Sequence, residues 1–413
     1  MIKTTAAEQA IRERIEARGR ITFAEFMQTA LYHPVDGYYT SESPFGATGD
    51  YYTSPAVHPA FGALLAKQLF GMWRGMGKPS DFTVVEMGSG NELLANDICS
   101  YASEISDEFF RRLNYICIDR YSLADADIAD VSGITRVLAN ELPLRDVVGC
   151  FLSNEFADAF PVHRFQIDSG EVLEVYVTLD DAGNFQEELA MPSTPLIEER
   201  LAGLSIALAD GHKGEVNLNL KPWLADVVEA LATGFLITVD YGYEAAELYS
   251  QSRQGGTLQT YYRHTEGSSP YQRIGRQDIT AHVDFSLLRE EGSAVGLATL
   301  EYTTQSEFLG SLGIGEMMRQ LREAPLGHHE RSANTLALRE LLKADGLGGF
   351  RVLVQEKATG LTSMPPIKSI GGKSRTPTVP LLSSRHMPLM EGRYPQTIWE
   401  MPSLWGETGY DVR

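Results

Sequence analysis

The sequence predicts an α/β fold with a mostly parallel sheet, and three observations support this prediction. Short apolar, β-branched runs alternate with helical patterns between Phe82 and Asp240, which is typical of parallel strands joined by helical crossovers. Several of these runs end in glycine or in a polar residue, as strands do where their carboxyl ends form a binding site. The chain has 413 residues and is 43% hydrophobic, enough for two domains or for one large core with insertions.

Residues 1–78 form a predicted N-terminal helical and lid region. Residues 4–30 place apolar side chains at helical spacing, with an interruption at Gly19, and Pro34 marks the end of the pattern. The following stretch, up to Pro55, is rich in Gly, Pro, Ser and Tyr. It is long for a structureless connection, which favours a lid or a binding loop. Residues 58–77 predict a further amphipathic helix.

Residues 79–359 form the predicted core. Its strands are expected at residues 82–88, 113–119, 147–155, 234–242 and 351–357, with helices between them. Two insertions are expected, near residues 161–215, where the pattern suggests antiparallel strands, and near residues 245–310. Residues 360–413 form a Pro-rich C-terminal tail, which we expect to be extended over the body or disordered.

The charge and the cysteines exclude several classes of protein. The chain has 35 basic and 55 acidic residues and a formal net charge of −20, which argues against nucleic-acid and anionic-membrane partners. No apolar run approaches the length of about 20 residues that a membrane helix needs, and no secretory signal begins the sequence. The three cysteines have no metal-ligand spacing, so no metal site is predicted. We therefore expect a soluble, cytoplasmic protein.

Two predicted strands end in residues that suit a nucleoside ligand. Gly88 and Gly90 allow a tight turn and a close approach of the backbone to a ligand, and Asp119 ends the next strand, where a carboxylate can accept two ribose hydroxyls. A lone Gly-x-Gly turn with a strand-end acid is also common without any nucleotide. Glu86 weighs against that alternative, because a carboxylate in an apolar strand end is costly without a role.

The same loop favours an adenosyl ligand without phosphates over a dinucleotide. A phosphate-binding loop would have glycine at position 93, where this chain has Leu93, and Glu92 would repel a pyrophosphate. S-adenosylmethionine carries a cationic sulfonium instead, which Glu86, Glu92 or Asp97 would favour. We therefore predict S-adenosylmethionine as the cofactor, with a nicotinamide dinucleotide as a distant alternative.

The segment Ser153–Pro161 is the candidate catalytic segment. It follows a predicted strand and holds Asn154, Glu155 and Asp158 close together. These residues could simply cap a local turn. They could also hold and polarise a nitrogen nucleophile that faces a methyl group, with most of the rate acceleration coming from orientation and electrostatics.

Eight segments together resemble one family, the MidA-type S-adenosylmethionine-dependent methyltransferases, which include mitochondrial complex I assembly factors. The segments are ITFAEFMQTALYHPVDGYY, GDYYTSPAVHPAFG, VVEMGSGNELLANDI, NEFADAFPVHRF, VDYGY, GGTLQTYYRH, GRQDITAHVDFS and QSEFLGSLGI. They occur in the order of the family and span about residues 21–313. The resemblance implies a class I methyltransferase fold with an added helical region, and N-methylation of a protein arginine.

The resemblance carries over to individual positions. Gly88, Gly90 and Asp119 match the cofactor site, and the family's GDF-x-TSP and DYG motifs match Gly49, Asp50, Thr53, Ser54, Asp240, Tyr241 and Gly242. Asn154, Glu155, Asp158 and Pro161 match its NEFFDALP segment. The chain departs from the family at Ser89, where proline is usual, at Glu92, where glycine is usual, and after Asp119.

Four functions stay open on this basis. The leading hypothesis is an S-adenosylmethionine-dependent N-methyltransferase acting on an arginine of a partner protein, with Asn154, Glu155 and Asp158 as catalytic residues. Its cofactor residues would be Glu86, Gly88, Gly90, Asp119, Asp50, Thr53, Ser54 and Asp97. The alternatives are a methyltransferase of a small molecule, an assembly or binding protein that has lost turnover, and a dinucleotide oxidoreductase. The sequence leaves a monomer and a homodimer open.

Overall fold

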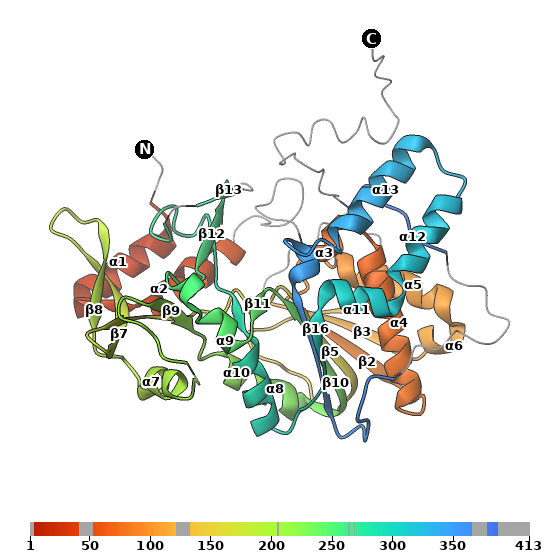
Figure 1. Cartoon of the computed structure of the whole chain (residues 1–413), viewed down its shortest axis with the longest axis horizontal. Helices are drawn as coiled ribbons and strands as arrows, with labels where there is room; N and C mark the ends of the chain where they lie inside the picture. The colour runs from red at the N-terminus through yellow and green to blue at the C-terminus, as the bar shows by residue number, and fades with distance from the viewer. Residues whose placement is uncertain are drawn as a thin grey trace, which may run out of the picture.

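A seven-stranded sheet forms the centre of the molecule in the computed structural model, which describes residues 4–40, 53–120, 133–204, 206–262, 265–267, 269–365 and 378–386 (Figure 1). The strand order is β16-β17-β10-β5-β2-β3-β4, and only β17 runs antiparallel to its neighbours. The α/β prediction is confirmed. The strands are β2 (Phe82–Met87), β3 (Leu113–Asp119), β4 (Ile134–Leu138), β5 (Val147–Asn154), β10 (Leu231–Asp240), β16 (Ala298–Thr304) and β17 (Arg351–Lys357).

Helices cover both faces of this sheet (Figure 1). One face packs against α4 (Ala60–Gly75), α5 (Leu93–Ile105), α6 (Asp107–Phe110), α11 (Gln305–Leu312), α12 (Ile314–Glu323) and α13 (His328–Glu340). The other face packs against α8 (Leu220–Ala230) and α10 (Phe285–Ala294). The central strands are therefore buried on both sides, which is why they appear in the sequence as nearly continuous apolar runs.

A second lobe combines the N-terminal helices with an antiparallel sheet (Figure 1). The region predicted as helical is two helices, separated at Gly19, whose φ of 82° ends the first, and Thr22 begins the second in a capping box with Glu25. The expected antiparallel strands form a separate sheet that includes the N-terminal β1. The elements are α1 (Ala6–Arg18), β1 (Ile21–Thr22), α2 (Phe23–Tyr32), β6 (His163–Asp168), β7 (Glu171–Leu179), β8 (Phe185–Ala190), α7 (Pro195–Ala202) and β9 (Lys213–Val216).

The remaining elements are short. They are the 3-10 helices η1 (Tyr38–Thr40), η2 (Gln251–Arg253) and η3 (Leu347–Gly349), the helices α3 (Ser54–Val57) and α9 (Ala245–Leu248), and the strands β11 (Gly242–Tyr243), β12 (Gln259–Tyr262), β13 (Thr265–Glu266), β14 (Asp278–Thr280) and β15 (Val283–Asp284). None of the described helices is both long and apolar enough to cross a bilayer.

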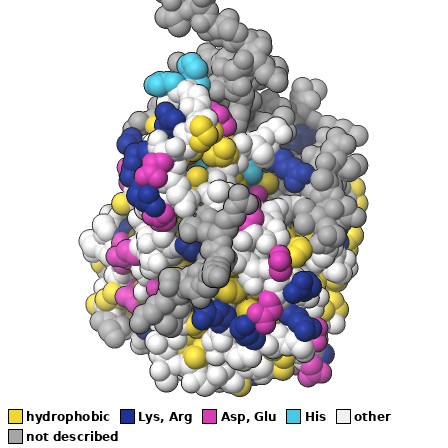
Figure 2. Space-filling model, turned by 90° about the vertical axis from the view of Figure 1, so that its right-hand side faces the viewer, with side chains coloured by type: hydrophobic (Ala, Val, Ile, Leu, Met, Phe, Trp, Pro, Cys, Tyr) yellow, Lys and Arg dark blue, Asp and Glu magenta, His cyan; other side chains and the backbone are white. Residues whose placement is uncertain are grey.

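The charged side chains on the α4–α6 side of the molecule are mixed in sign. Figure 2 shows acidic and basic side chains interspersed on this face, with hydrophobic side chains scattered between them. Surface charges of this kind are screened within about 8 Å at physiological salt. The excess of acidic residues can therefore influence a ligand only where carboxylates line a cavity.

Candidate functional site

A cavity of about 310 Å³ lies at the carboxyl ends of β2, β3 and β5, with the N-terminal α2 and η1 on its other side. The strand order of the sheet reverses between β2 and β5, the point at which open α/β sheets bind their ligands. The cavity is lined by Gln28, Tyr32, Tyr39, Met87, Gly88, Ile118, Asp119, Arg120, Ala139, Asn140, Glu141, Leu142, Glu155, Phe156, Ala159, Phe160, Pro161, Asn219, Pro222, Trp223 and Asp226.

The loop after β2 has the backbone that its glycines predict. Gly88 has a φ of 69°, and a Cβ atom at this position would lie 2.6 Å from the ring of Phe156. Gly90 has a φ of 53°, and its backbone N–H donates to Asp119 Oδ2 at 3.1 Å. Asp119 therefore ties the loop after β2 to the end of β3, while its side chain also lines the cavity.

Glu92 occupies the third glycine-like position of this loop. It has a left-handed backbone with a φ of 59°, which costs a non-glycine residue about 1–2 kcal/mol. Its buried carboxylate accepts hydrogen bonds from Arg136 Nε at 2.7 and 2.8 Å. The ion pair with Arg136 on β4 offsets the burial of the charge, so Glu92 is part of the framework beside the loop.

Replacing Arg136 with alanine should lower the free energy of unfolding by about 2 kcal/mol, because the Glu92 carboxylate stays buried without this counter-ion. The double variant Glu92→Gly/Arg136→Ala should recover most of that loss, since glycine also removes the backbone strain. Urea denaturation followed by circular dichroism measures both values. A neutral Arg136→Ala variant would contradict this account of the ion pair.

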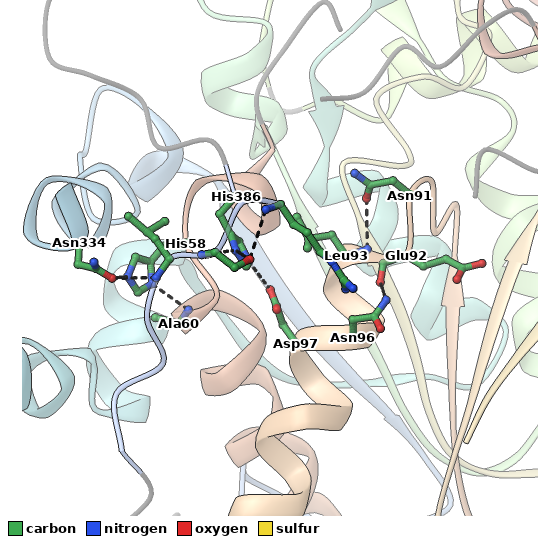
Figure 3. Close-up of polar contacts among 12 residues, drawn as sticks. His58, Ala60, Asn91, Glu92, Leu93, Asn96, Asp97, Asn334 and His386 are labelled. Atoms are coloured by element: carbon green, nitrogen blue, oxygen red, sulfur yellow. Dashed lines mark hydrogen bonds and ion pairs between the residues drawn. The ribbon is translucent and has the colours of Figure 1, made fainter. Parts of the chain in front are cut away.

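Two acidic residues predicted to contact the cofactor do not line the cavity. Glu86 is buried on the α4–α5 side of β2, where it accepts a hydrogen bond from the Tyr115 hydroxyl at 2.8 Å, and burial raises its pKa to about 8. Asp97 lies on α5 and contacts His386 Nε2 at 3.0 Å (Figure 3). The structure gives both side chains protein partners away from the cavity.

Glu155 is the residue of the candidate catalytic segment that lines the cavity. It directly follows β5 and has a φ of 49°, a strained backbone of the kind found at functional sites. Its Oε1 accepts hydrogen bonds from the backbone N–H of Ser54 at 3.2 Å and from Asn154 Nδ2 at 3.0 Å. Burial and the neighbouring Asp158 carboxylate raise its pKa to about 8.

Asp158 lies behind Glu155 and is buried. Its Oδ2 accepts a hydrogen bond from the Tyr241 hydroxyl, and burial raises its pKa to about 6 in spite of that bond. Among the described residues, its Oδ1 has no hydrogen-bond partner, and neither has Oδ1 of Asn154. Buried acceptors without partners are rare in proteins, and these two lie beside a cavity carboxylate.

The DYG motif and the segment around Ala281 hold the candidate catalytic segment, Ser153–Pro161, in place. Oδ2 of Asp240, at the end of β10, accepts the backbone N–H groups of residues 156, 157 and 158 at 3.0–3.4 Å, which fixes the turn that follows β5. The backbone N–H of Ala281 donates to the Asp158 carbonyl at 3.0 Å. The segments around residues 54, 155, 241 and 281, which the family resemblance singled out, therefore converge in space.

The structure describes the TSP motif, Thr53–Pro55, but not the residues directly before it. Ser54 is fully buried and begins α3, and its hydroxyl donates to Gln305 Oε1 at 3.0 Å. Thr53 precedes α3 and does not line the cavity. Asp50 lies outside the described residues. The motif's contact with a cavity residue is thus the hydrogen bond from the Ser54 backbone N–H to Glu155.

Several cavity residues are not among the predicted site residues. Tyr32 stacks on Tyr39 with ring centroids 5.5 Å apart, and the Arg120 guanidinium lies 4.8 Å from the centroid of the Tyr32 ring. Trp223 Nε1 donates to Met87 Sδ at 3.4 Å and packs on Phe156. Residues 139–142 follow β4, and recognising that strand would have pointed to them, whereas only the tertiary structure brings the aromatic residues together.

The site combines a glycine loop, a strand-end carboxylate, aromatic walls and a pair of raised-pKa carboxylates. This combination suits a cationic or neutral ligand with a ribose, because carboxylates dominate the charged lining. In the part of the chain that the structure describes, no group of three or more His, Cys, Asp or Glu side chains could hold a metal ion.

Comparisons with known proteins agree with this arrangement. A family model described as "Putative S-adenosyl-L-methionine-dependent methyltransferase" matches residues 64–303, more than half of the chain. The protein arginine methyltransferase NDUFAF7 of Danio rerio is 28% identical over 341 residues, covering 75% of this chain and 76% of that protein. The Drosophila melanogaster homologue is 29% identical over 308 residues, covering 68% of each chain.

A solved structure is also similar. It is a COG1565 superfamily member from Burkholderia thailandensis bound to S-adenosyl-homocysteine, with a TM-score of 0.78 and 26% sequence identity. The similarity covers 88% of this chain and 95% of that chain. It therefore extends over both the central sheet and much of the second lobe.

Proposed function

The chain belongs to this family of S-adenosyl-L-methionine-dependent methyltransferases, and from that premise we propose that it methylates a guanidinium nitrogen of an arginine on a partner protein. The relatives named protein arginine methyltransferases support this substrate at 25–29% identity. The observation that carries the proposal is a pair of neighbouring carboxylates: half-buried Glu155 lines the cofactor cavity, and buried Asp158 lies behind it.

The cavity fits the cofactor. S-adenosylmethionine, when bound, supplies a methyl group on a positively charged sulfur. Gly88 lets the backbone pack closely against Phe156 in the cavity wall, where a Cβ would clash, and Asp119 offers a carboxylate on the wall to ribose hydroxyls. Asp158 provides negative charge behind the same wall, and Glu155 adds to it when it is ionised. No lysine lies among the lining residues, and Arg120 is the lining arginine, packed over Tyr32.

A guanidinium matches the unsatisfied acceptors of the site. It is always charged near neutral pH and presents five N–H donors in a fixed plane. Glu155 offers a carboxylate in the cavity, and the unpartnered oxygens of Asn154 and Asp158 lie beside it. These groups can accept several of the five donors and hold one nitrogen toward the cofactor, which is the main requirement for in-line methyl transfer.

The reaction also requires a proton acceptor. Methylation of a guanidinium nitrogen would release one proton from that nitrogen. Asp158, with a pKa of about 6, is ionised near neutral pH and accepts that proton in the proposed mechanism. Glu155 holds the guanidinium, and binding of this cation favours the ionised form of Glu155.

The proposal is tested with the purified full-length protein, S-adenosylmethionine carrying a labelled methyl group, and a cell lysate depleted of small molecules. We expect label in protein, and mass spectrometry should place it on arginine. A second reaction contains only the small-molecule fraction of the lysate. Label that appears only in that reaction would instead establish a small-molecule substrate, and label on lysine would overturn the assignment of the guanidinium.

A further inference from the structure

The C-terminal segment that the structure describes, residues 378–386, packs directly on the methyltransferase core; we call it the C-terminal strap. Val379 and Leu382 are buried in the same apolar cluster as α4 and α5. His386 is also buried, although it belongs to a segment that the sequence predicts to be extended or disordered. The strap lies beyond residues 64–303, to which the family model applies.

The first attachment of the strap is to α5, the helix that follows the cofactor loop. Figure 3 shows His386 pointing toward Asp97, and the distance from Nε2 to Oδ2 is 3.0 Å. The backbone N–H of Ser383 donates to His386 Nδ1 at 3.3 Å, so Nδ1 is an acceptor and the proton on Nε2 faces Asp97. Both side chains are largely buried, with exposed fractions of 4% and 13%.

Asp97 is close to the cofactor loop and has little room to move. It lies one turn into α5, which begins at Leu93 directly after Glu92. A Cβ at Gly62 of α4 would lie only 2.5 Å from the Cβ of Asp97, so the two helices are in close contact there. The first turn of α5 is therefore held between α4 on one side and His386 on another.

The second attachment of the strap is to the segment that follows Ser54. The backbone N–H of Leu382 donates to Asn334 Oδ1 at 2.9 Å, and the same oxygen accepts from His58 Nε2 at 3.1 Å (Figure 3). His58 Nδ1 accepts the backbone N–H of Ala60 at 3.0 Å, which fixes its tautomer. His58 directly follows α3, whose first residue, Ser54, donates to the Glu155 carboxylate.

We propose that the C-terminal strap is a positioning element of the methyltransferase site. Through Asp97 it holds the helix that carries the cofactor loop, and through Asn334 and His58 it holds the segment that orients Glu155. His386 and Asp97 are positioning residues, because neither lines the cavity. The effect on cofactor binding rests on the proposed function, whereas the effect on the order of α5 does not.

The test compares His386→Ala, Asp97→Ala and the double variant in the full-length protein. Calorimetry should show an affinity for S-adenosylhomocysteine that is about fivefold or more weaker in each single variant. The double variant should bind no more weakly than the single variant with the lower affinity, because both substitutions remove the same contact between His386 and Asp97. His386→Gln keeps a donor and should recover part of the affinity. Ser384→Ala changes an exposed neighbour and serves as the matched control.

Hydrogen exchange separates this proposal from the proposed function. In ligand-free protein, the amides of residues 93–98 should exchange faster in His386→Ala than in the wild type or Ser384→Ala, while β5 keeps its protection. Unchanged exchange in α5 would overturn the strap proposal even if no cofactor binds. Binding to the wild type and equal binding to both single variants would overturn its link to the cofactor. Failure of the wild type to bind S-adenosylhomocysteine would count against the proposed function alone.

Discussion

Gly88→Val should reduce the affinity for S-adenosylhomocysteine by about 100-fold or more. Gly88 lines the cavity, and a side chain at this position would clash with Phe156 in the cavity wall. The φ of 69° also strains any residue with a Cβ, at a cost of about 1–2 kcal/mol. The new Cβ would lie 2.6 Å from Phe156, whose ring packs against Phe160 and Trp223 with centroid distances of 5.0 and 5.9 Å. The ring therefore has little space into which it could withdraw.

Gly183→Val is the matched control for this variant. Gly183 has a φ of 82° in the turn between β7 and β8, and a Cβ there meets nothing within 4 Å. It carries the same kind of backbone strain without a clash, so its affinity for S-adenosylhomocysteine should stay at the wild-type value. Calorimetry measures binding, and circular dichroism checks that both variants are folded. Normal binding by Gly88→Val would show that the ligand does not approach this loop.

The sequence predicts the buried strands better than the edges of the sheet. The strands β2, β3, β5 and β10 are largely buried, so each contains an apolar run that periodicity detects. By contrast, β4 and β16 are edge strands with largely exposed or half-buried side chains, and their mixed sequences ITRVL and ATLEYTT show no apolar run. Missing β4 also meant missing the cavity residues that follow it.

The residues of the candidate site can likewise be divided into those that the sequence pattern predicts and those that only tertiary packing explains. Gly88, Asp119 and Glu155 come together because the carboxyl ends of neighbouring parallel strands meet at one edge of the sheet, which the sequence pattern implies. Asp97 looks like a cofactor residue from the sequence because it follows the glycine loop closely. Its partner His386 is 289 positions away in a Pro-rich tail, and only tertiary packing brings the two together.

Asp158→Asn should lower kcat by about 10²–10⁴-fold, since the amide cannot accept the proton that methylation releases. In the wild type, kcat/KM should rise as the pH passes about 6, where Asp158 ionises, and should rise further toward a pH of about 8, where Glu155 ionises. The first rise should be missing in Asp158→Asn. The second should move to lower pH, because the Asp158 charge is one of the causes that raise the pKa of Glu155.

Tyr241→Phe tests the same assignment without removing the carboxylate. The Tyr241 hydroxyl donates to Asp158 and stabilises its ionised form, which lowers the pKa of Asp158 below the value that burial alone would produce. Loss of the hydroxyl therefore raises that pKa, and the acidic limb of kcat/KM should move to higher pH. Tyr249→Phe removes another buried hydroxyl, which donates to the Glu215 carbonyl at 2.9 Å, and should leave the limb in place. An unmoved limb in Tyr241→Phe would mean that Asp158 does not control it, and the proton acceptor would then have to be Glu155.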